Sequence, residues 1–362
     1  NVYDLRNRLT SRTDAANKQT AYRYDPNDNL VLATDRKGQV TNIQYDALNR
    51  ISQITDAAGR ITQYSYDLAG NLAHIADSQS GDILLSYDSL NRLTQVITNQ
   101  GSVNYQYDAL GRRTQRTLDG GDATGYSYDR ANRIKSITYR GKTVAYSYDA
   151  AGRLIQKTLP NGVAANYQYD AANRLTALSY VKPDTTVLSA LAYTYDANGH
   201  RISQSQNAKT DTPFTATYDA ANRMATYNGY PLTYDANGNL VQRQSATGIV
   251  TYTWNARNQL TGISGPSGTA SFKYDALGRR IEKTVNGVTT QYLYDGNQAI
   301  AELSGSAIGA TYLTGLQIDE VLARYSASGD RSLIADALGS VLAQADGAGA
   351  VQTQYGYSPY GE

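Results

Sequence analysis

A seven-residue phrase, Tyr-Asp-x-x-Gly/Asn-Arg-Leu/Ile, recurs along this chain and constrains its fold more than any other feature. Residues 45–51 give a clear copy, and the steps between copies are mostly 20 or 21 residues. Its Tyr-Asp dyads begin at Tyr3, Tyr24, Tyr45, Tyr66, Tyr87, Tyr107, Tyr128, Tyr148, Tyr169, Tyr195, Tyr218, Tyr234 and Tyr274, while Trp254-Asn255 replaces the dyad once and Tyr294-Asp295 carries it without the tail. A fixed period over most of a chain indicates a repeat architecture.

One repeat, residues 19–39, shows what each unit can form. Residues 20–24 alternate so that Tyr22 and Tyr24 share one face of an extended strand. Pro26 then fits the second position of a turn, residues 30–34 read as a second strand, and Gly38 lies in a second turn. The sequence therefore predicts an all-β protein in which each unit contributes two strands and two turns.

The turn that follows each dyad has its own chemistry. An aspartate at the first turn position can accept the backbone N–H two residues later. Glycine or asparagine at the fourth position tolerates the positive φ of a bulged hairpin. The dyad aspartates are Asp25, Asp46, Asp67, Asp88, Asp108, Asp129, Asp149, Asp170, Asp196, Asp219, Asp235 and Asp275. The fourth position holds Gly70, Gly111, Gly152, Gly238 and Gly278, or Asn7, Asn49, Asn91, Asn132, Asn173 and Asn222.

An arginine usually comes next, and its role is open between two interpretations. These arginines are Arg8, Arg50, Arg92, Arg112, Arg133, Arg153, Arg174, Arg223 and Arg279. Each could reach an aspartate of its own or of an adjacent unit, or it could be a solvated cation at the start of a strand. An exposed pair contributes only about 0–1 kcal/mol, so such pairs would matter mainly as a network.

The aromatic residues favour a ring that carries a hydroxyl, because the chain has 32 Tyr, 2 Phe and 1 Trp. We expect rings whose hydroxyl end stays in water, on a face covered by little else. Two strands per unit advance a sheet by about 10 Å, so this many units cannot stay in a flat open sheet. The sequence therefore predicts a long, coiled, single-layer antiparallel sheet of YD hairpins, which is a spiral hollow shell or part of one.

Composition argues against several other classes of protein. The net charge is +1, with 33 basic and 32 acidic residues, which does not favour nucleic acid as a partner. The chain has no cysteine for disulfides or thiolate metal sites, and no apolar run long enough to span a membrane. His74 and His200 stand at ordinary repeat positions, which favours substitutions over a metal site. We expect no catalytic residue, metal site or cofactor in this chain.

The repeat beat divides the chain into two regions. Residues 1–298 form the predicted YD array, with irregular insertions near residues 181–186 and 207–214 that read as longer surface turns. The short step from Tyr218 to Tyr234 predicts a clipped hairpin. In residues 299–362 the repeat phrase no longer recurs. The sequence there predicts short strands and tight turns, which suits a terminal cap or the start of another domain.

The repeated phrase resembles the Rhs, or YD-repeat, family. A second resemblance lies in residues 336–340 (Asp-Ala-Leu-Gly-Ser) and 355–362 (Tyr-Gly-Tyr-Ser-Pro-Tyr-Gly-Glu), which are similar to the opening of the Rhs repeat-associated core domain. That family more often has His where Ala337 stands, and Asp and Phe where Ser358 and Tyr360 stand. The family includes bacterial Rhs polymorphic toxins, the C component of insecticidal toxin complexes and the animal teneurins.

The resemblance implies a function as well as a fold. In the bacterial proteins the sheet encloses a C-terminal toxin, and the core domain releases it by aspartic self-cleavage. The two protease aspartates of the family lie beyond the segment that matches Glu362, so the resemblance places self-cleavage and the cargo outside this sequence. It implies a non-catalytic shell segment of a secreted or cell-surface protein. Its partners would be the enclosed cargo and the rest of the shell, with delivery-machinery components left open.

Two alternative functions stay open at this point. Exposed rows of tyrosine could stack on sugar rings, which would make the chain a surface adhesion module that binds glycans. Two of the many aspartates could also flank a glycosidic bond as a catalytic pair. A turn-capping role explains the dyad aspartates equally well in every copy, so nothing in the spacing selects one pair as catalytic.

Overall fold

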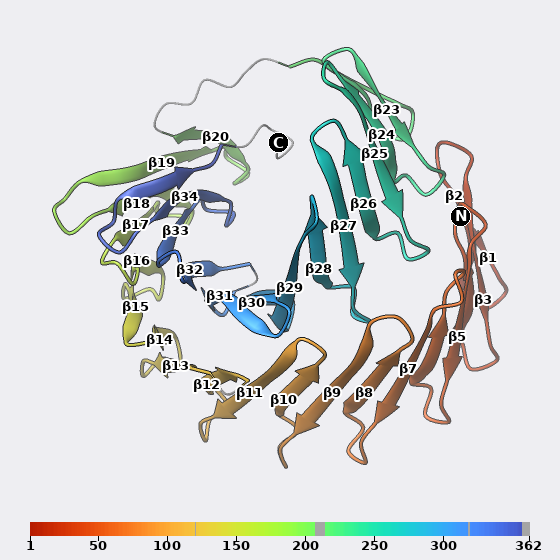
Figure 1. Ribbon diagram of the computed structural model, residues 1–362, viewed down its shortest axis with the longest axis horizontal. Helices are drawn as coiled ribbons and strands as arrows, with labels where there is room; N and C mark the ends of the chain where they lie inside the picture. The colour runs from red at the N-terminus through yellow and green to blue at the C-terminus, as the bar shows by residue number, and fades with distance from the viewer. Residues whose placement is uncertain (120, 207–213, 318, 357–362) are drawn as a thin grey trace. The chain divides into compact units, whose positions relative to one another are not determined.

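The computed structural model describes residues 1–119, 121–206, 214–317 and 319–356. Within these ranges every regular element is a β-strand, and each printed strand pairing is antiparallel between neighbours in the sequence. Figure 1 shows these strands following one another side by side. The predicted all-β architecture of YD hairpins is confirmed.

The chain forms two compact units, each made of two arms that are distant in sequence. Unit 1 contains residues 1–100 and 213–292, and unit 2 contains residues 101–212 and 293–362. The first arm of unit 1 comprises β1(Val2–Tyr3), β2(Leu9–Thr13), β3(Gln19–Tyr24), β4(Leu30–Thr34), β5(Val40–Tyr45), β6(Ile51–Thr55), β7(Ile61–Tyr66), β8(Leu72–Asp77), β9(Gly81–Tyr87) and β10(Leu93–Thr98). Its second arm comprises β21(Ala216–Tyr218), β22(Met224–Tyr227), β23(Tyr230–Tyr234), β24(Leu240–Ser245), β25(Gly248–Trp254), β26(Leu260–Gly265), β27(Gly268–Tyr274) and β28(Arg280–Val285), and β29(Val288–Asp295) runs on into unit 2.

Unit 2 repeats this plan. Its first arm comprises β11(Gly101–Tyr107), β12(Arg113–Leu118), β13(Ala123–Tyr128), β14(Ile134–Tyr139), β15(Lys142–Tyr148), β16(Leu154–Thr158), β17(Ala164–Tyr169), β18(Leu175–Val181), β19(Val187–Tyr195) and β20(Arg201–Gln206). Its second arm comprises β30(Gln298–Ser304), β31(Ala307–Thr314), β32(Val321–Ser326), β33(Arg331–Ala335), β34(Val341–Ala345) and β35(Val351–Gln354).

Each dyad ends one strand and starts a bulged turn. On β5 and β6, Gln44 pairs with Gln53 while Tyr45 pairs with Ile51, so the register shifts by one residue at the tyrosine. The same shift occurs at Tyr24, Tyr66 and the later dyads. From β1 to β28 each odd-numbered strand is joined to the next even-numbered strand by a dyad turn, with Trp254-Asn255 in place of the dyad once. These turns therefore lie at one edge of each arm that contains them, which we call the YD edge.

The turns at the opposite edge, which we call the return edge, differ between the arms of unit 1. In the first arm the turns that begin at Asp14, Asp35 and Asp56 again read Asp-x-x-Gly/Asn; Gly38, for example, has a φ of 79° and its N–H donates to the Asp35 carbonyl over 2.9 Å. In the second arm they are uncharged tight turns such as Asn228–Gly229. That turn belongs to the hairpin of β22 and β23, where the short repeat step predicted a clipped hairpin.

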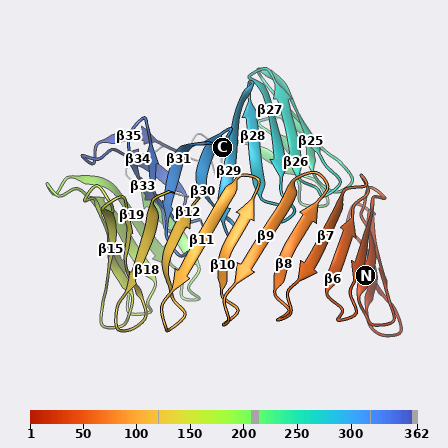
Figure 2. The ribbon, with the colours of Figure 1, turned by 60° about the horizontal axis from the view of Figure 1, so that its bottom comes forward.

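The two arms of unit 1 meet edge to edge. The YD edge of the second arm lies on the return edge of the first, as Figure 2 shows for β25–β27 above β6–β9. Asn237 Nδ2 donates to Asp35 Oδ2 over 2.6 Å, and Arg257 Nε donates to Asp56 Oδ2 over 2.8 Å. We call this contact the seam. It closes one edge of the first arm with another layer of the same chain.

The two arms of unit 2 instead pack face to face. One core joins β17–β19 and the turn before β17 to β33 and β34, with Leu178 and Ile334 almost fully buried. A second core joins β13–β15 to β31 and β32, where the Tyr139 and Tyr325 ring centroids lie 5.1 Å apart. Within each arm the sheet is a single layer. In unit 2 the second arm forms a second layer, because its strands pack apolar side chains against the face of the first arm that carries the buried tyrosines.

Two boundaries expected from the sequence keep their status as predictions. The predicted boundary between residues 298 and 299 marks the end of the sequence repeat. The two compact units are defined by spatial contacts, so they do not test that boundary. Of the expected insertions, the turn after β18 is described, with Lys182 N–H donating to the Thr186 carbonyl over 2.8 Å. Most of the second insertion, residues 207–213, and residues 357–362 of the expected core-domain motif lie outside the described residues.

Candidate functional site: the Tyr-Asp-Arg ladder

The dyad aspartate organises its own turn. Asp46 Oδ1 accepts the N–H groups of Leu48, over 2.9 Å, and of Arg50, over 3.0 Å. The Asn49 N–H donates to the Asp46 carbonyl over 3.0 Å, and Asn49 has a φ of 58°. A short carboxylate side chain suits this role because it reaches its own backbone two and four residues on.

The predicted turn residues share this geometry. The fourth turn residue has a positive φ at Asn7, Asn49, Asn91, Asn132, Asn173, Asn222, Gly70, Gly111, Gly152, Gly238 and Gly278. The first turn residue accepts backbone N–H groups at Asp25, Asp46, Asp67, Asp88, Asp108, Asp129, Asp149, Asp170, Asp196, Asp219, Asp235 and Asp275. Each capped turn fixes the direction in which the next strand leaves.

The dyad tyrosine reaches the neighbouring repeat. The Tyr66 hydroxyl, at the end of β7, donates to the Ile51 carbonyl at the start of the adjacent strand β6 over 2.9 Å, fifteen residues back. Equivalent bonds of 2.7 to 3.0 Å are made by Tyr24, Tyr45, Tyr87, Tyr128, Tyr148, Tyr169, Tyr195, Tyr234 and Tyr274. The hydroxyls of these dyads therefore satisfy backbone carbonyls, whereas the sequence led us to expect them in water.

This bond explains the choice of aromatic residue. Trp254, which replaces the dyad tyrosine once, donates its Nε1–H to the Leu240 carbonyl over 2.8 Å and so makes the same bond with another group. Phenylalanine has no donor and would leave that carbonyl without its partner. Tyrosine and tryptophan both combine an aromatic ring with a donor at its far end, and both make this bond in the structure.

The arginine that follows the turn joins two repeats. Arg50 binds Asp46 through Nε, over 2.8 Å, and Nη2, over 2.7 Å, while its guanidinium carbon lies 4.1 Å from the centroid of the Tyr66 ring. Arg8, Arg112, Arg133, Arg153, Arg174 and Arg223 lie in the same way over the tyrosine of the next repeat, at 4.4 to 5.1 Å. Of the two interpretations open for these arginines, the structure shows the paired one.

The turns also contact one another directly along the YD edge. Arg112 Nη1 donates to Asn132 Oδ1 over 2.8 Å, and Arg153 Nη1 donates to Asn173 Oδ1 over 2.9 Å. Where asparagine replaces arginine, Asn71 Nδ2 makes the equivalent bond to Asn91 Oδ1 over 2.9 Å. Carboxylate, guanidinium, ring and amide together link neighbouring repeats within an arm, and we call this set of contacts the Tyr-Asp-Arg ladder.

The ladder shifts the ionisation of both members of the dyad. The backbone N–H and the guanidinium of Arg50 hold the pKa of Asp46 below its ordinary value. Burial raises the pKa of Tyr45, and the charge of Asp25 raises it further. Both shifts stabilise the state that makes the bonds: an ionised aspartate and a neutral tyrosine. His200 takes the arginine position in one repeat, where its Nδ1 lies 2.9 Å from Asp196 Oδ2.

A buried charge cluster lies at the seam of unit 1, and the repeat phrase gave no sign of it. Arg60 Nε donates to both oxygens of Asp77 over 2.8 Å, and Thr62 Oγ1 donates to Asp77 Oδ2 over 2.6 Å. Burial raises the pKa of Asp77, but the bonds from Arg60 and Thr62 lower it more, so the net shift is downward. Arg257 Nη2 also donates to Thr62 Oγ1 over 3.0 Å, so the cluster ties the second arm to the first.

A second buried cluster lies in unit 2, around the dyad that lacks its tail. Asp295 Oδ2 pairs with Arg113 Nη1 over 2.7 Å and with Arg116 Nη1 over 3.1 Å, and Asp295 Oδ1 accepts the Tyr105 hydroxyl over 2.9 Å. Burial raises the pKa of Asp295, and the two guanidiniums lower it by more. Arg116 is 1% exposed. This aspartate therefore holds the two arms together instead of capping a turn.

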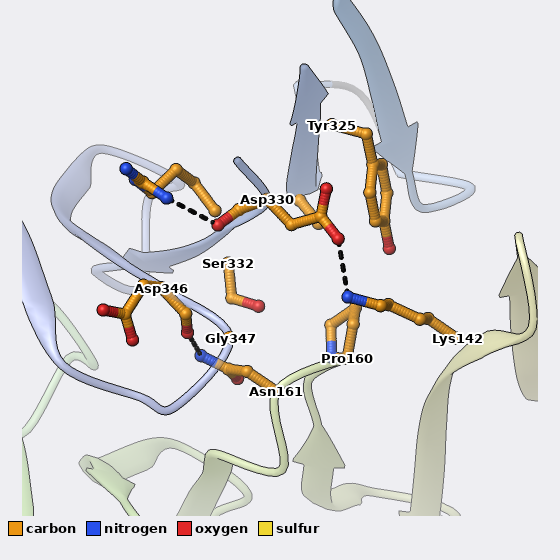
Figure 3. Close-up of a pocket in the computed structure, with 10 residues that line it drawn as sticks. Lys142, Pro160, Asn161, Tyr325, Asp330, Ser332, Asp346 and Gly347 are labelled. Atoms are coloured by element: carbon orange, nitrogen blue, oxygen red, sulfur yellow. Dashed lines mark hydrogen bonds and ion pairs between the residues drawn. The ribbon is translucent and has the colours of Figure 1, made fainter. Parts of the chain in front are cut away.

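The carboxylates that line the hollows of the structure are mostly paired, whereas the Tyr325 hydroxyl and the Gln39 side-chain oxygen are buried there without a hydrogen-bond partner in the described part of the chain. Figure 3 shows one in unit 2 where Lys142 Nζ donates to Asp330 Oδ2 over 2.6 Å beside Tyr325, and its open volume of about 10 Å³ is the space of roughly one water molecule. A wider depression of about 410 Å³ lies at the seam, where Asp35 and Asp56 are held by the contacts given above. The described residues contain no group of three or more His, Asp or Glu that could hold a metal ion.

Comparison with known proteins agrees with this repeat geometry. The family model described as teneurin YD-shell matches residues 2–138 and 163–362, and the model described as RHS repeat matches residues 128–164. The chain belongs to the teneurin YD-shell family. The resemblance to Rhs and YD-repeat proteins is thereby confirmed.

Two curated bacterial relatives share part of the sequence. The tRNA3(Ser)-specific nuclease WapA of Bacillus spizizenii is 30% identical over 182 residues, which is 48% of this chain and 8% of that protein. The tRNA nuclease WapA of Bacillus subtilis (strain 168) is 35% identical over 114 residues, which is 30% of this chain and 5% of that protein. This chain therefore spans less than a tenth of the length of either relative.

Solved toxin structures share the fold. A crystal structure of TcdB2-TccC3-Cdc42 superposes with a TM-score of 0.73 at 18% identity, covering 99% of this chain and 25% of that one. A Photorhabdus luminescens Tc holotoxin pore gives a TM-score of 0.66 at 17% identity, covering 99% of this chain and 26% of that one. Almost the whole chain thus adopts a fold found within much longer toxin polypeptides. Among the described residues there is no helix suited to crossing a membrane.

Proposed function

We propose that this chain is a non-catalytic wall segment of a shell that encloses a toxin or other polypeptide cargo until delivery. The observation that carries the proposal is the Tyr-Asp-Arg ladder, which joins each repeat to the next through a hydroxyl, a guanidinium and an amide. Such a ladder satisfies polar groups along the sheet and leaves few openings through which water or a protease could reach past it. The membership of the chain in a shell-forming family supports the same role.

The face of the first arm of unit 2 that points away from the cores suits a passive wall. Most of the residues that alternate with its buried side chains are Asn, Gln, Ser, Thr, Ala or Gly, among them Asn104, Gln106, Gln115, Thr117, Gly125, Ser127, Ser136, Thr138, Thr143, Ala145, Ser147, Gln156, Thr158, Asn166, Gln168, Ala177, Ser179, Ala190, Ala192 and Thr194. Strong binding surfaces depend on aromatic and arginine anchors, which are missing from this set.

The geometry favours the shell over the adhesion module. Glycan binding through tyrosine rows needs rings whose faces and hydroxyls are available to a sugar. The Tyr66 ring has the Arg50 guanidinium over it, and its hydroxyl is donated to the Ile51 carbonyl. We further propose that residues 299–362 begin the core domain of a longer exported protein, that the cargo lies elsewhere in that protein, and that the ladder residues act structurally and not in catalysis.

Protease protection of the intact natural protein tests the proposal. Limited proteolysis with mass-spectrometric mapping should yield cargo peptides only after the wall is opened. Replacing Asp77 with alanine leaves Arg60 buried without its partner and should open the seam, so that cargo peptides appear earlier than in the parent protein. Thr143→Ser, on the uncovered face, is the matched control. Equal cleavage of the cargo in the parent, the variant and the control would contradict shielding by this wall.

A further inference from the structure

The buried cluster of unit 2 shows what a pair of cations on an aromatic face can bind. On β11 and β12, Tyr105 lies opposite Arg116. The Arg113 guanidinium carbon lies 5.7 Å from the centroid of the same ring and 4.7 Å from that of Tyr126 on β13. One carboxylate, that of Asp295, binds both arginines over 2.7 and 3.1 Å. Two cations beside two rings thus form a receptor for a carboxylate that comes from a different part of the polypeptide.

The strands β27–β29 of unit 1 carry the same arrangement. Phe272 lies opposite Lys283, in the register that joins a ring to a cation on β11 and β12. The guanidinium carbon of Arg280 lies 5.4 Å from the centroid of the Phe272 ring and 5.7 Å from that of Tyr292. The Lys283 ammonium lies 5.8 Å from the Tyr292 centroid. Register, rings and cations therefore match those of β11–β13.

This second receptor differs in that its lysine lacks a carboxylate partner among the residues that the structure describes. Lys283 is partly buried, and Glu282 beside it lies on the other face of β28, where it pairs with Lys273 over 2.8 Å. The described residues paired in register along the face of Lys283 are apolar, hydroxyl-bearing or basic: Leu232, Arg243, Val250, Tyr252, Ile263, Ala270, Phe272 and Thr290. A partly buried ammonium on such a face favours an anionic partner.

We propose that Lys283 and the rings beside it bind an aspartate or glutamate of the enclosed cargo. The proposal rests on the proposed function, because it takes the cargo as the partner. Aromatic rings and cations are the anchors on which binding surfaces depend, and apolar residues that flank the carboxylate would cover Phe272. A cargo held unfolded presents apolar and acidic side chains together, which a small anion does not. One partly exposed ion pair is weak, so the contact permits release when the shell opens.

Carbodiimide crosslinking of the intact natural protein, mapped by mass spectrometry, tests the proposal. The reagent activates a carboxylate, an adjacent amine displaces it to form an amide, and the carbodiimide leaves as a urea. Lys283 should become joined to an aspartate or glutamate of the cargo. Lys273 and Glu282, which are paired in the structure, should become joined in the same sample and so report that the chemistry worked. Lys283→Arg keeps the charge and removes the amine, so only the first crosslink should be lost.

Charge reversal gives an independent readout. In Lys283→Glu the cargo segment found by crosslinking should exchange its amide hydrogens faster than in the parent, because like charges repel. Lys135→Glu, at an exposed lysine of β14, is the matched control and should leave that exchange unchanged. A Lys273–Glu282 crosslink that still forms in Lys283→Glu shows that β27 and β28 remain folded.

Two results would overturn the contact. One is a Lys283 that joins only to carboxylates of the wall, or to none, while the Lys273–Glu282 crosslink forms. The other is hydrogen exchange in the cargo that Lys283→Glu and Lys135→Glu change equally. If the cargo stays protected from protease in either case, this contact is wrong and the shell stands. A cargo that is cleaved freely in the parent protein would instead remove the shell itself.

Discussion

Two tyrosines on one strand allow a sharp test of the ladder. On β15 the Tyr148 hydroxyl donates to the Ile134 carbonyl over 2.9 Å, whereas the Tyr146 hydroxyl is buried and has no partner. Replacing Tyr148 with phenylalanine removes one hydrogen bond to the backbone, which should cost about 1 kcal/mol. Replacing Tyr146 removes only a buried hydroxyl that makes no bond, so Tyr146→Phe should be neutral or stabilising.

Urea unfolding of the two single variants, followed by circular dichroism, measures this difference. The reasoning predicts a lower midpoint for Tyr148→Phe and an unchanged or higher midpoint for Tyr146→Phe. Hydrogen exchange should locate the loss at β14 and β15, which the Tyr148 bond connects. The two substitutions delete the same atom from the same strand, so ring packing is matched. Equal destabilisation, or a larger loss for Tyr146→Phe, would refute the role given to the dyad hydroxyl.

Three other perturbations follow from the same contacts. Gly111→Val places a β-branched residue at a φ of 78°, so it should lower the free energy of unfolding by at least roughly 1–2 kcal/mol and speed proteolysis at that turn. An unchanged melting temperature would show that this turn does not need a residue that tolerates positive φ. Trp254→Phe should lower the melting temperature, and Trp254→Tyr should keep it near that of the parent. A Trp254→Phe variant that melts at the parent's temperature would argue against a stabilising bond to the Leu240 carbonyl. Burial raises the pKa of Tyr180 to about 12, so the stabilisation it gives is complete below about pH 10 and is lost as pH rises through 12; equal losses of stability between about pH 10 and 12 in the parent and in Tyr180→Phe would contradict this.

The local half of each repeat could be predicted from the sequence. An aspartate followed three residues later by Gly or Asn specifies its own capped turn, and the contacts involved, such as Asp46 to Arg50, lie within five residues. The partner of the tyrosine was missed because Ile51 lies fifteen residues before Tyr66 and becomes a neighbour only when repeats stack. The single Trp254 was an available signal, since it keeps the ring and a donor.

The contacts between arms had no local signal. Arg257 and Asp56 are 201 residues apart, and both occupy positions that read as ordinary turn residues. The sequence around Asp295 did give a signal. The Gly or Asn three residues after a dyad aspartate, and the Arg that follows it, are both missing there. An aspartate freed from capping can serve another cation, and the structure shows it between Arg113 and Arg116.

The most direct test of the account is a double-mutant cycle across two repeats. Arg133 lies 4.4 Å from the Tyr148 ring centroid, and the account holds that such contacts couple neighbouring repeats. Arg133→Met, Tyr148→Leu and the double variant, measured by urea unfolding, should give a coupling energy of about 0.5–1 kcal/mol. A coupling indistinguishable from zero would contradict the claim that the ladder, and not each hairpin alone, holds the wall together.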